Sequence, residues 1–173
     1  MNSTFARRTA AVPLLADLYP EIRDELIARM EARPWEDGET LIRQGDSEPR
    51  DLVLLVDGEV DVYVRAGTQR LHLATLGMGS LFGEVAFFDE TSTRSADVIG
   101  RGPGLAAVLH RREWMELSAL NHPAARIIET TLLRLLADRC LAATARIEGV
   151  LSGTAATGLA GVVSGLLPRP EKA

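Results

Sequence analysis

The feature that most constrains this chain is a change of hydrophobic period along its length. From Trp35 to Val108 apolar and polar residues alternate in short runs, whereas the flanking segments repeat apolar residues every three or four positions. Alternation is typical of half-buried strands, and the longer period is typical of amphipathic helices. Turn signals such as Asp57-Gly58 and Ala66-Gly67 recur between the alternating runs. This pattern favours an antiparallel sandwich or barrel between helical ends.

The same pattern gives a domain plan. We expect helices in residues 12–33, a β-roll in residues 35–108 and further helices in residues 111–148. Pro34 is expected to end the first helical segment. The 173-residue chain is long enough for one domain with a core, which we place in residues 1–148. Residues 149–173 are expected to form a Gly/Ala-rich tail that is flexible or partly helical, with an interaction segment as the alternative.

Charge and metal-ligating residues limit the possible partners. Lys and Arg number 19 against 24 Asp and Glu, so a net charge of -5 argues against general attraction to nucleic acid or anionic membrane. Cys140 is the single cysteine, which excludes an intramolecular disulfide and argues against a Cys-rich zinc site. His72, His110 and His122 are far apart in sequence, so no metal site is predicted.

The two ends do not predict export or membrane insertion. Arg7-Arg8 and the apolar residues after it resemble a twin-arginine signal, but the apolar stretch is short and contains Pro13. Cytoplasmic residence is therefore expected. Gly149 to Leu167 is uncharged, but Gly, Ser and Thr make it a weak candidate for a membrane span.

One segment carries chemistry, the run FGEVAFFDETSTRSADV. Gly83 allows backbone N–H groups to approach a ligand, and Val85–Phe88 can form a short helical turn whose N–H groups favour an anion. Arg94 and Ser95 can donate hydrogen bonds to a phosphate. Glu84 would repel a phosphate, so its expected partner is a sugar hydroxyl. Together these residues predict a site for a nucleotide monophosphate.

The segment offers no bond-breaking machinery. It contains no paired catalytic carboxylates, no Ser-His pair and no Walker lysine. We therefore expect a binding protein that is not an enzyme, with no catalytic residues and no cofactor.

This run resembles the phosphate-binding cassette of the cyclic-nucleotide-binding domain family, at the length found in bacterial catabolite activators. Residues 36–46 resemble the family's first hairpin, and Leu52–Val64 resembles the next strand pair with its turn glycine, Gly58. The resemblance covers residues 12–148. It implies a mainly β fold, a cupin-like antiparallel jelly roll of about eight strands with N-terminal helices and a long C-terminal helix.

The resemblance also implies roles for individual residues. Arg94 would pair with the cyclic phosphate, Glu84 would accept the ribose 2′-hydroxyl, and the Gly83 backbone would lie near the sugar-phosphate. Ser95 matches a second phosphate contact, and Thr144 falls roughly where some relatives contact the base. The candidate ligand-binding residues are thus Phe82, Gly83, Glu84, Val85, Ala86, Arg94, Ser95 and Thr144.

Several prominent residues are expected to be structural. Phe82, Phe87 and Phe88 should pack in the core or at a hinge rather than stack on a base. Trp35 and Trp114 should be structural, and Cys140 should be a buried apolar residue of its helix.

The expected function is a regulatory module that binds a 3′,5′-cyclic nucleotide, cAMP in preference to cGMP. Binding would move the C-terminal helix, which would contact a protein partner or form a homodimer through residues 124–148. Direct nucleic-acid binding is not expected, because no helix-turn-helix follows the long helix. The alternatives are a scaffold or dimerisation protein with a degenerate site, a cupin-type enzyme, and a transcription factor without its DNA module.

Overall fold

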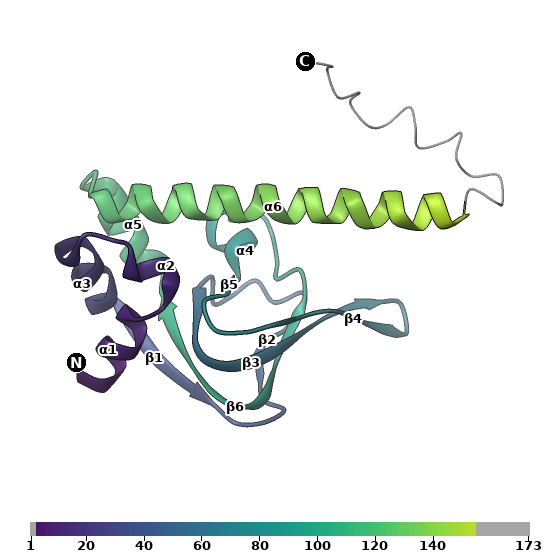
Figure 1. Ribbon diagram of the computed structural model, residues 1–173, viewed down its shortest axis with the longest axis horizontal. Coiled ribbons are helices and arrows are strands. Elements are labelled where there is room, and N and C mark those ends of the chain that lie inside the picture. Colours follow the sequence, from purple (N-terminus) through teal and green to yellow (C-terminus); the bar gives the residue numbers. More distant parts are fainter. Residues whose placement is uncertain (1–2, 155–173) are drawn as a thin grey trace, which may run out of the picture. The chain divides into compact units, whose positions relative to one another are not determined.

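The computed structural model describes residues 3–154 of the chain, which divide into two units between Ile127 and Ile128. Helices and strands follow the predicted order of helices, sheet and helices (Figure 1). The helices are α1 Ser3–Ala10, α2 Pro13–Ala16, α3 Pro20–Ala28, α4 Glu84–Phe88, α5 Arg111–Ala119 and α6 Pro123–Thr154. The strands are β1 Met30–Trp35, β2 Thr40–Ile42, β3 Leu52–Ala66, β4 Gln69–Leu76, β5 Leu81–Phe82 and β6 Asp97–Leu109.

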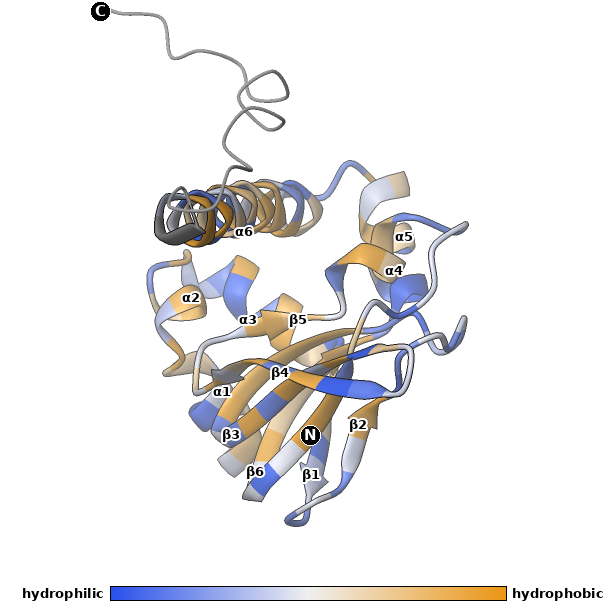
Figure 2. Ribbon diagram, turned by 90° about the vertical axis from the view of Figure 1, so that its right-hand side faces the viewer, coloured by the Kyte–Doolittle hydropathy of each residue, from blue (hydrophilic) through white to orange (hydrophobic). Residues whose placement is uncertain are grey.

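All strand pairs are antiparallel, and two long strands organise the sheet. β6 pairs with β1, β2 and β3, and β3 also pairs with β4 and β5. Hydrophobic residues run along β3, β6 and α4 (Figure 2). The predicted antiparallel β fold with flanking helices is confirmed. Residues 3–154 contain six strands, two of them with 15 and 13 residues, so the predicted count of about eight is not confirmed.

The predicted turn at Asp57-Gly58 is wrong. β3 continues through Gly58 as one strand, and its register against β6 shifts on both sides of Asp57. Gly58 has a φ of +84°, which suits an irregularity in the strand rather than a chain reversal. A glycine signal in sequence marks an unusual backbone, but it does not tell a bulge from a hairpin.

The predicted first helical segment is too long. α3 ends at Ala28, and Met30–Trp35 is strand β1, paired with β6 from Met30↔Leu109 to Trp35↔Gly104. Pro34 therefore lies within a strand and does not end a helix. Because β1 is an edge strand, a residue without a backbone N–H is tolerated there. Helix α1 was not expected, and its Arg8 forms an ion pair with Asp57.

Trp35 anchors the core of the sheet. Its side chain is buried, and its indole Nε1 donates to the Gly102 carbonyl at 3.0 Å. The ring lies so close to β6 that a Cβ added at Gly104 would be 2.0 Å from it, and one added at Gly100 would be 2.3 Å away. Around it pack buried residues of β2, β3, β5 and β6, among them Leu41, Leu55, Val60, Phe82, Val98 and Val108.

The helices after the sheet follow the prediction closely. The break between α5 and α6 contains Asn121 with a φ of +52°, and Leu117 packs with Ala124 and Ala125. α6 continues past Glu148 to Thr154, so the first residues of the predicted tail are helical, and residues 155–173 lie outside the described part. Cys140 is exposed, so its predicted burial is wrong. No helix within residues 3–154 is long and apolar enough to cross a bilayer.

Candidate functional site

The candidate cassette connects two strands through a short helix. It leaves β5 at Phe82, turns at Gly83, forms α4 and returns to β6 after Arg94. Gly83 has a φ of +88° and directly precedes the helix, so a left-handed residue starts it. The predicted helical turn over Val85–Phe88 is confirmed, and it begins one residue earlier at Glu84.

The two ends of the cassette meet at one hydrogen bond. The Arg94 guanidinium donates from Nη1 to the Gly83 carbonyl oxygen at 2.8 Å, although the two residues are 11 positions apart. A Cβ added at Gly83 would lie 2.7 Å from this nitrogen and equally close to the Asp51 carbonyl oxygen. Gly83 is therefore needed both for its backbone angle and for the space beside Arg94.

Arg94 is buried against the loop between β2 and β3. Only 5% of the residue is exposed, and its Nη2 donates to the carbonyl oxygens of Pro49 and of Asp51, the latter at 3.0 Å. Burial lowers the pKa of Arg94 from its ordinary value, and the negative charges of Asp51 and Glu48 oppose that change. A guanidinium stays charged under such conditions, so the site keeps a cation that can pair with an anion.

The backbone of Arg94 fixes its position as well. Its N–H donates to the Asp46 carbonyl at 2.8 Å, and its carbonyl accepts from the Gly45 N–H at 2.8 Å. These bonds attach the end of the cassette to the loop after β2. Sequence reasoning identified Arg94 but missed the partners Pro49 and Asp51, because carbonyl acceptors leave no mark in a sequence pattern.

The other predicted residues are arranged unevenly around Arg94. Glu84 is buried at the start of α4. Its negative charge, like those of Asp51 and Glu48, opposes the lowering of the Arg94 pKa by burial. Val85 and Ser95 are exposed, whereas Ala86 is buried. Phe82 is buried in the core of the sheet, which agrees with its predicted packing role.

The remaining aromatic residues of the segment pack on α5. The Trp114 ring lies 5.5 Å from the Phe87 ring and 5.1 Å from the Phe88 ring, centroid to centroid. The Phe88 pair is edge-on and the Phe87 pair is tilted, and both keep the rings within the distance at which aromatic pairs stabilise one another. The predicted packing role of Phe87 and Phe88 is confirmed, and it connects the cassette helix to the helix that follows the sheet.

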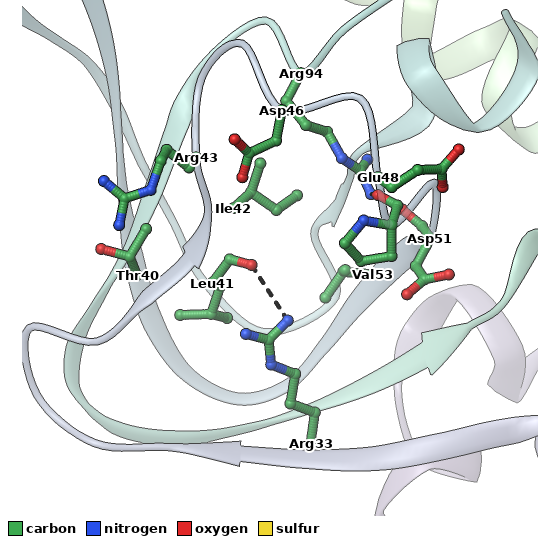
Figure 3. A pocket seen from close by; sticks show the side chains of 11 residues that line it. Arg33, Thr40, Leu41, Ile42, Arg43, Asp46, Glu48, Asp51, Val53 and Arg94 are labelled. Carbon is green, nitrogen blue, oxygen red and sulfur yellow. Dashed lines mark hydrogen bonds between the residues drawn. The ribbon is translucent and has the colours of Figure 1, made fainter. Parts of the chain in front are cut away.

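A pocket of about 120 Å³ adjoins Arg94 (Figure 3). Its walls include Leu41, Ile42 and Val53, and at the side opposite Arg94 the Arg33 guanidinium donates to the Leu41 carbonyl at 3.2 Å. The pocket is smaller than a usual site for a whole nucleotide. Its lining is mixed, because Arg33, Arg43, Asp46, Glu48 and Asp51 also contribute to it.

Thr144 belongs to the second unit. Its hydroxyl donates to the Cys140 carbonyl at 3.0 Å, one turn earlier in α6. Its predicted contact with a base stays a prediction. Within residues 3–154, no three His, Cys, Asp or Glu side chains are grouped to hold a metal ion.

Comparison with known sequences places the cassette in a family context. The family model for the cyclic nucleotide-binding domain matches residues 32–121. Glutaminase 1 of Bradyrhizobium diazoefficiens is 33% identical over 84% of this chain and 22% of its own length. The cyclic AMP receptor protein of Thermus thermophilus is 32% identical over 61% of this chain and 48% of its own length. The cAMP-dependent protein kinase regulatory subunit of Colletotrichum orbiculare is 31% identical over 57% of this chain.

Solved structures agree with this context. The Thermus thermophilus catabolite activator protein has a TM-score of 0.68 at 28% identity, covering 80% of this chain and 62% of that one. The N-terminal domain of a transcriptional regulator from Streptomyces coelicolor, at 24% identity and a TM-score of 0.63, shares the fold. The chain spans about a fifth to a half of the length of the curated relatives. By its matched residues and its fold, the chain belongs to the cyclic nucleotide-binding domain family.

Proposed function

We propose that the chain is a regulatory module that binds a 3′,5′-cyclic nucleotide, cAMP in preference to cGMP, and has no catalytic activity of its own. The observation that carries the proposal is the buried guanidinium of Arg94, held 2.8 Å from the Gly83 carbonyl at the start of α4. A buried cation beside a left-handed glycine and a helix start suits a small anion.

Each cassette residue has a chemical part in this proposal. Arg94 pairs with the cyclic phosphate through guanidinium N–H groups that the carbonyls of Gly83, Pro49 and Asp51 do not use, and exposed Ser95 donates a further hydrogen bond. Glu84 accepts from the ribose 2′-hydroxyl, which a carboxylate can do without approaching the phosphate. Gly83, Val85 and Ala86 supply backbone to the sugar-phosphate, with Phe82 packed beneath them.

The preference for cAMP rests on the relatives. Two of them are named for cyclic AMP, a receptor protein and a cAMP-dependent protein kinase regulatory subunit. The matching part of the Bradyrhizobium glutaminases is about a fifth of those proteins, so a region like this one also occurs within much longer chains. This supports a module that acts on something attached to it or bound by it.

The route of the signal is proposed to be α6, with Thr144 contacting the base. The helix carries exposed apolar side chains that are suited to a protein partner or a second copy, and a cytoplasmic module with such a helix fits the expected regulatory role. These side chains are Leu133, Leu141, Ile147 and Val150. A ligand can shift such a helix only through different affinities for its two arrangements.

Thermal unfolding with cAMP, cGMP and 5′-AMP tests the proposal, on the parent, on Arg94→Ala and on Arg101→Ala. A ligand at about 100 times its Kd adds about 2.7 kcal/mol to the free energy of unfolding. We expect cAMP to raise the parental midpoint most and to leave that of Arg94→Ala unchanged. Arg101, with 60% of its side chain exposed, controls for loss of a positive charge and should keep the full shift.

The result also decides the alternative, a nucleotide-independent scaffold that dimerises through residues 124–148. Exposed apolar residues on α6 are the observation that favours it. If none of the three nucleotides moves the parental midpoint, the scaffold replaces the module. If Arg94→Ala keeps the parental shift, the assigned site is wrong.

A further inference from the structure

Arg50, in the loop between β2 and β3, reaches the cassette from outside. Its Nη1 lies 2.9 Å from the Asp89 carbonyl oxygen, 3.1 Å from that of Ser92 and 3.4 Å from that of Ala86. The last carbonyls of a helix have no partner within the helix, so they accept from such a donor. One guanidinium nitrogen therefore contacts both the end of α4 and the segment that leads from it to Arg94.

The contact is reciprocal. Arg50 donates to the cassette backbone, while Arg94 of the cassette donates to the carbonyls of Pro49 and Asp51, the two neighbours of Arg50. Because the β2–β3 loop and the cassette each donate a side chain to the other's backbone, the two cannot separate without breaking both sets of hydrogen bonds.

A second arginine holds the same helix from another side. Arg111, the first residue of α5, donates from Nε to the Phe87 carbonyl at 2.8 Å and pairs with Glu90 at 2.7 Å. The carbonyls of Ala86 and Phe87, neighbours in α4, thus accept from arginines of two different elements. The helix that Arg50 contacts is therefore also attached to α5 through Arg111.

The surroundings of Arg50 argue against an ordinary surface ion pair. Only 13% of its side chain is exposed, although its carboxylate partner Glu48 is 70% exposed and 2.9 Å away. An exposed pair of this kind contributes little to stability. Arg33 and Arg65 also donate to a carbonyl, but their side chains are 37% and 47% exposed. Arg50 combines low exposure with three cassette carbonyls near one nitrogen.

We propose that Arg50 is a positioning residue for the cassette, which keeps residues 84–94 in their binding arrangement before the nucleotide arrives. This rests on the proposed function for the identity of the ligand. A site ordered in advance binds more tightly, because less conformational freedom is lost on binding. Arg50 would raise affinity through the arrangement of Arg94, without touching the ligand.

The test compares Arg50→Gln with Arg112→Gln, a matched loss of one arginine charge. Arg112 is 76% exposed, and within residues 3–154 its guanidinium bonds only to its neighbour Glu113. Amide hydrogen exchange of the ligand-free chain gives the first measurement, and the Kd for cAMP by calorimetry gives the second. Arg50→Lys keeps the charge but loses the planar donor group.

We expect Arg50→Gln to speed exchange at residues 84–94 and to weaken cAMP binding about tenfold, the size of one lost charge-assisted hydrogen bond. Arg50→Lys should lie between it and the parent, and Arg112→Gln should match the parent in both measurements. Comparing exchange in the core strands β3 and β6 separates this local effect from a global loss of stability.

The proposal is overturned if cassette exchange in Arg50→Gln equals that of the parent, or if Arg112→Gln produces the same change. If Arg50→Gln does not fold, the comparison of Arg50→Lys with the parent in cassette exchange and cAMP affinity decides in its place. A parent that binds neither cAMP nor cGMP refutes the proposed function, and the exchange measurement still decides whether Arg50 holds the cassette.

Discussion

The region around Trp35 and the cassette both need glycines, because another group lies where a side chain would be. That group differs between the two regions. Gly100 and Gly104 leave room for a buried indole ring within the sheet. Gly83 leaves room for a guanidinium and a backbone carbonyl. Around Trp35 apolar packing fixes the chain, whereas in the cassette hydrogen bonds between arginines and carbonyls do so. Changes at the first region should therefore act on global stability, and changes at the second on local order and ligand affinity.

The largest effect is expected from Trp35→Ala. Removing a large buried ring costs about 3–5 kcal/mol of unfolding free energy, and here it also removes the hydrogen bond to Gly102. Urea unfolding monitored by circular dichroism gives the value. A cost below about 1 kcal/mol would contradict the central position of this ring.

A double-mutant cycle sharpens that result. Gly104→Ala alone should cost about 1–3 kcal/mol, because its Cβ would lie 2.0 Å from the Trp35 ring. In the Trp35→Ala background the same substitution should cost almost nothing, since the ring is gone. Equal costs in both backgrounds would show that the strain arises elsewhere.

Gly83→Ala is expected to have a smaller effect on stability and a larger one on the site. A left-handed alanine costs about 1–2 kcal/mol, and its Cβ would displace Arg94 from the Gly83 carbonyl. We therefore expect cAMP affinity to fall by at least about tenfold. Gly67→Ala is the control, because Gly67 has a φ of +60° and nothing within 4 Å of an added Cβ.

Gly67→Ala should lose less stability than Gly83→Ala, because it carries the backbone strain without the clash with Arg94 and the Asp51 carbonyl, and it should keep the parental affinity. Calorimetry with cAMP on both variants makes the comparison. If the two variants bind equally well, Gly83 acts only through its backbone angle, and the assigned contact with Arg94 does not contribute to binding.

The same contrast explains what the sequence could predict. Alternating apolar residues identified the antiparallel sheet, and the spacing from Gly83 to Arg94 identified the cassette, because both are local patterns. Residues 30–33 of strand β1 were predicted as helix, since their helical period is local but their partners in β6 lie 73 to 79 positions away, from Arg33↔Ala106 to Met30↔Leu109. Pairing with β6 prevails over local preference there.

The contacts of the buried arginines lay beyond prediction for a related reason. Arg94 and Arg50 donate to main-chain carbonyls, and every residue has one, so no residue type marks the acceptor. Gly58 shows the same limit, since its left-handed backbone was expected in a turn and occurs in a strand irregularity. A glycine in the sequence marks a position with an unusual backbone angle, and the pairing of the strands determines whether it forms a turn or an irregularity.

The smallest expected effect is a pH dependence from His110, which contacts strand β1 and the loop between β2 and β3. Its Nδ1 is 3.0 Å from the Asp51 carboxylate, and its Nε2 is 3.0 Å from the Glu31 carboxylate. Hydrogen bonds to Glu31 and then Asp51 raise the pKa of His110 above its ordinary value near 6.5, against the opposing effect of burial.

A raised pKa in the folded state means that protonated His110 favours folding. This stabilisation is fully present below the unfolded value of about 6.5 and is lost as the pH rises through the higher folded pKa. We expect His110→Gln to remove that part of the slope when urea unfolding is measured at pH 6, 7 and 8. Proton NMR of the His110 ring should show its pKa falling in Glu31→Gln, because one of its two carboxylate acceptors is then neutral. A parental ring that titrates at or below about 6.5 would mean that Asp51 does not hold the imidazolium, and that the loop carrying Arg50 is attached to the cassette by its arginine contacts without this histidine.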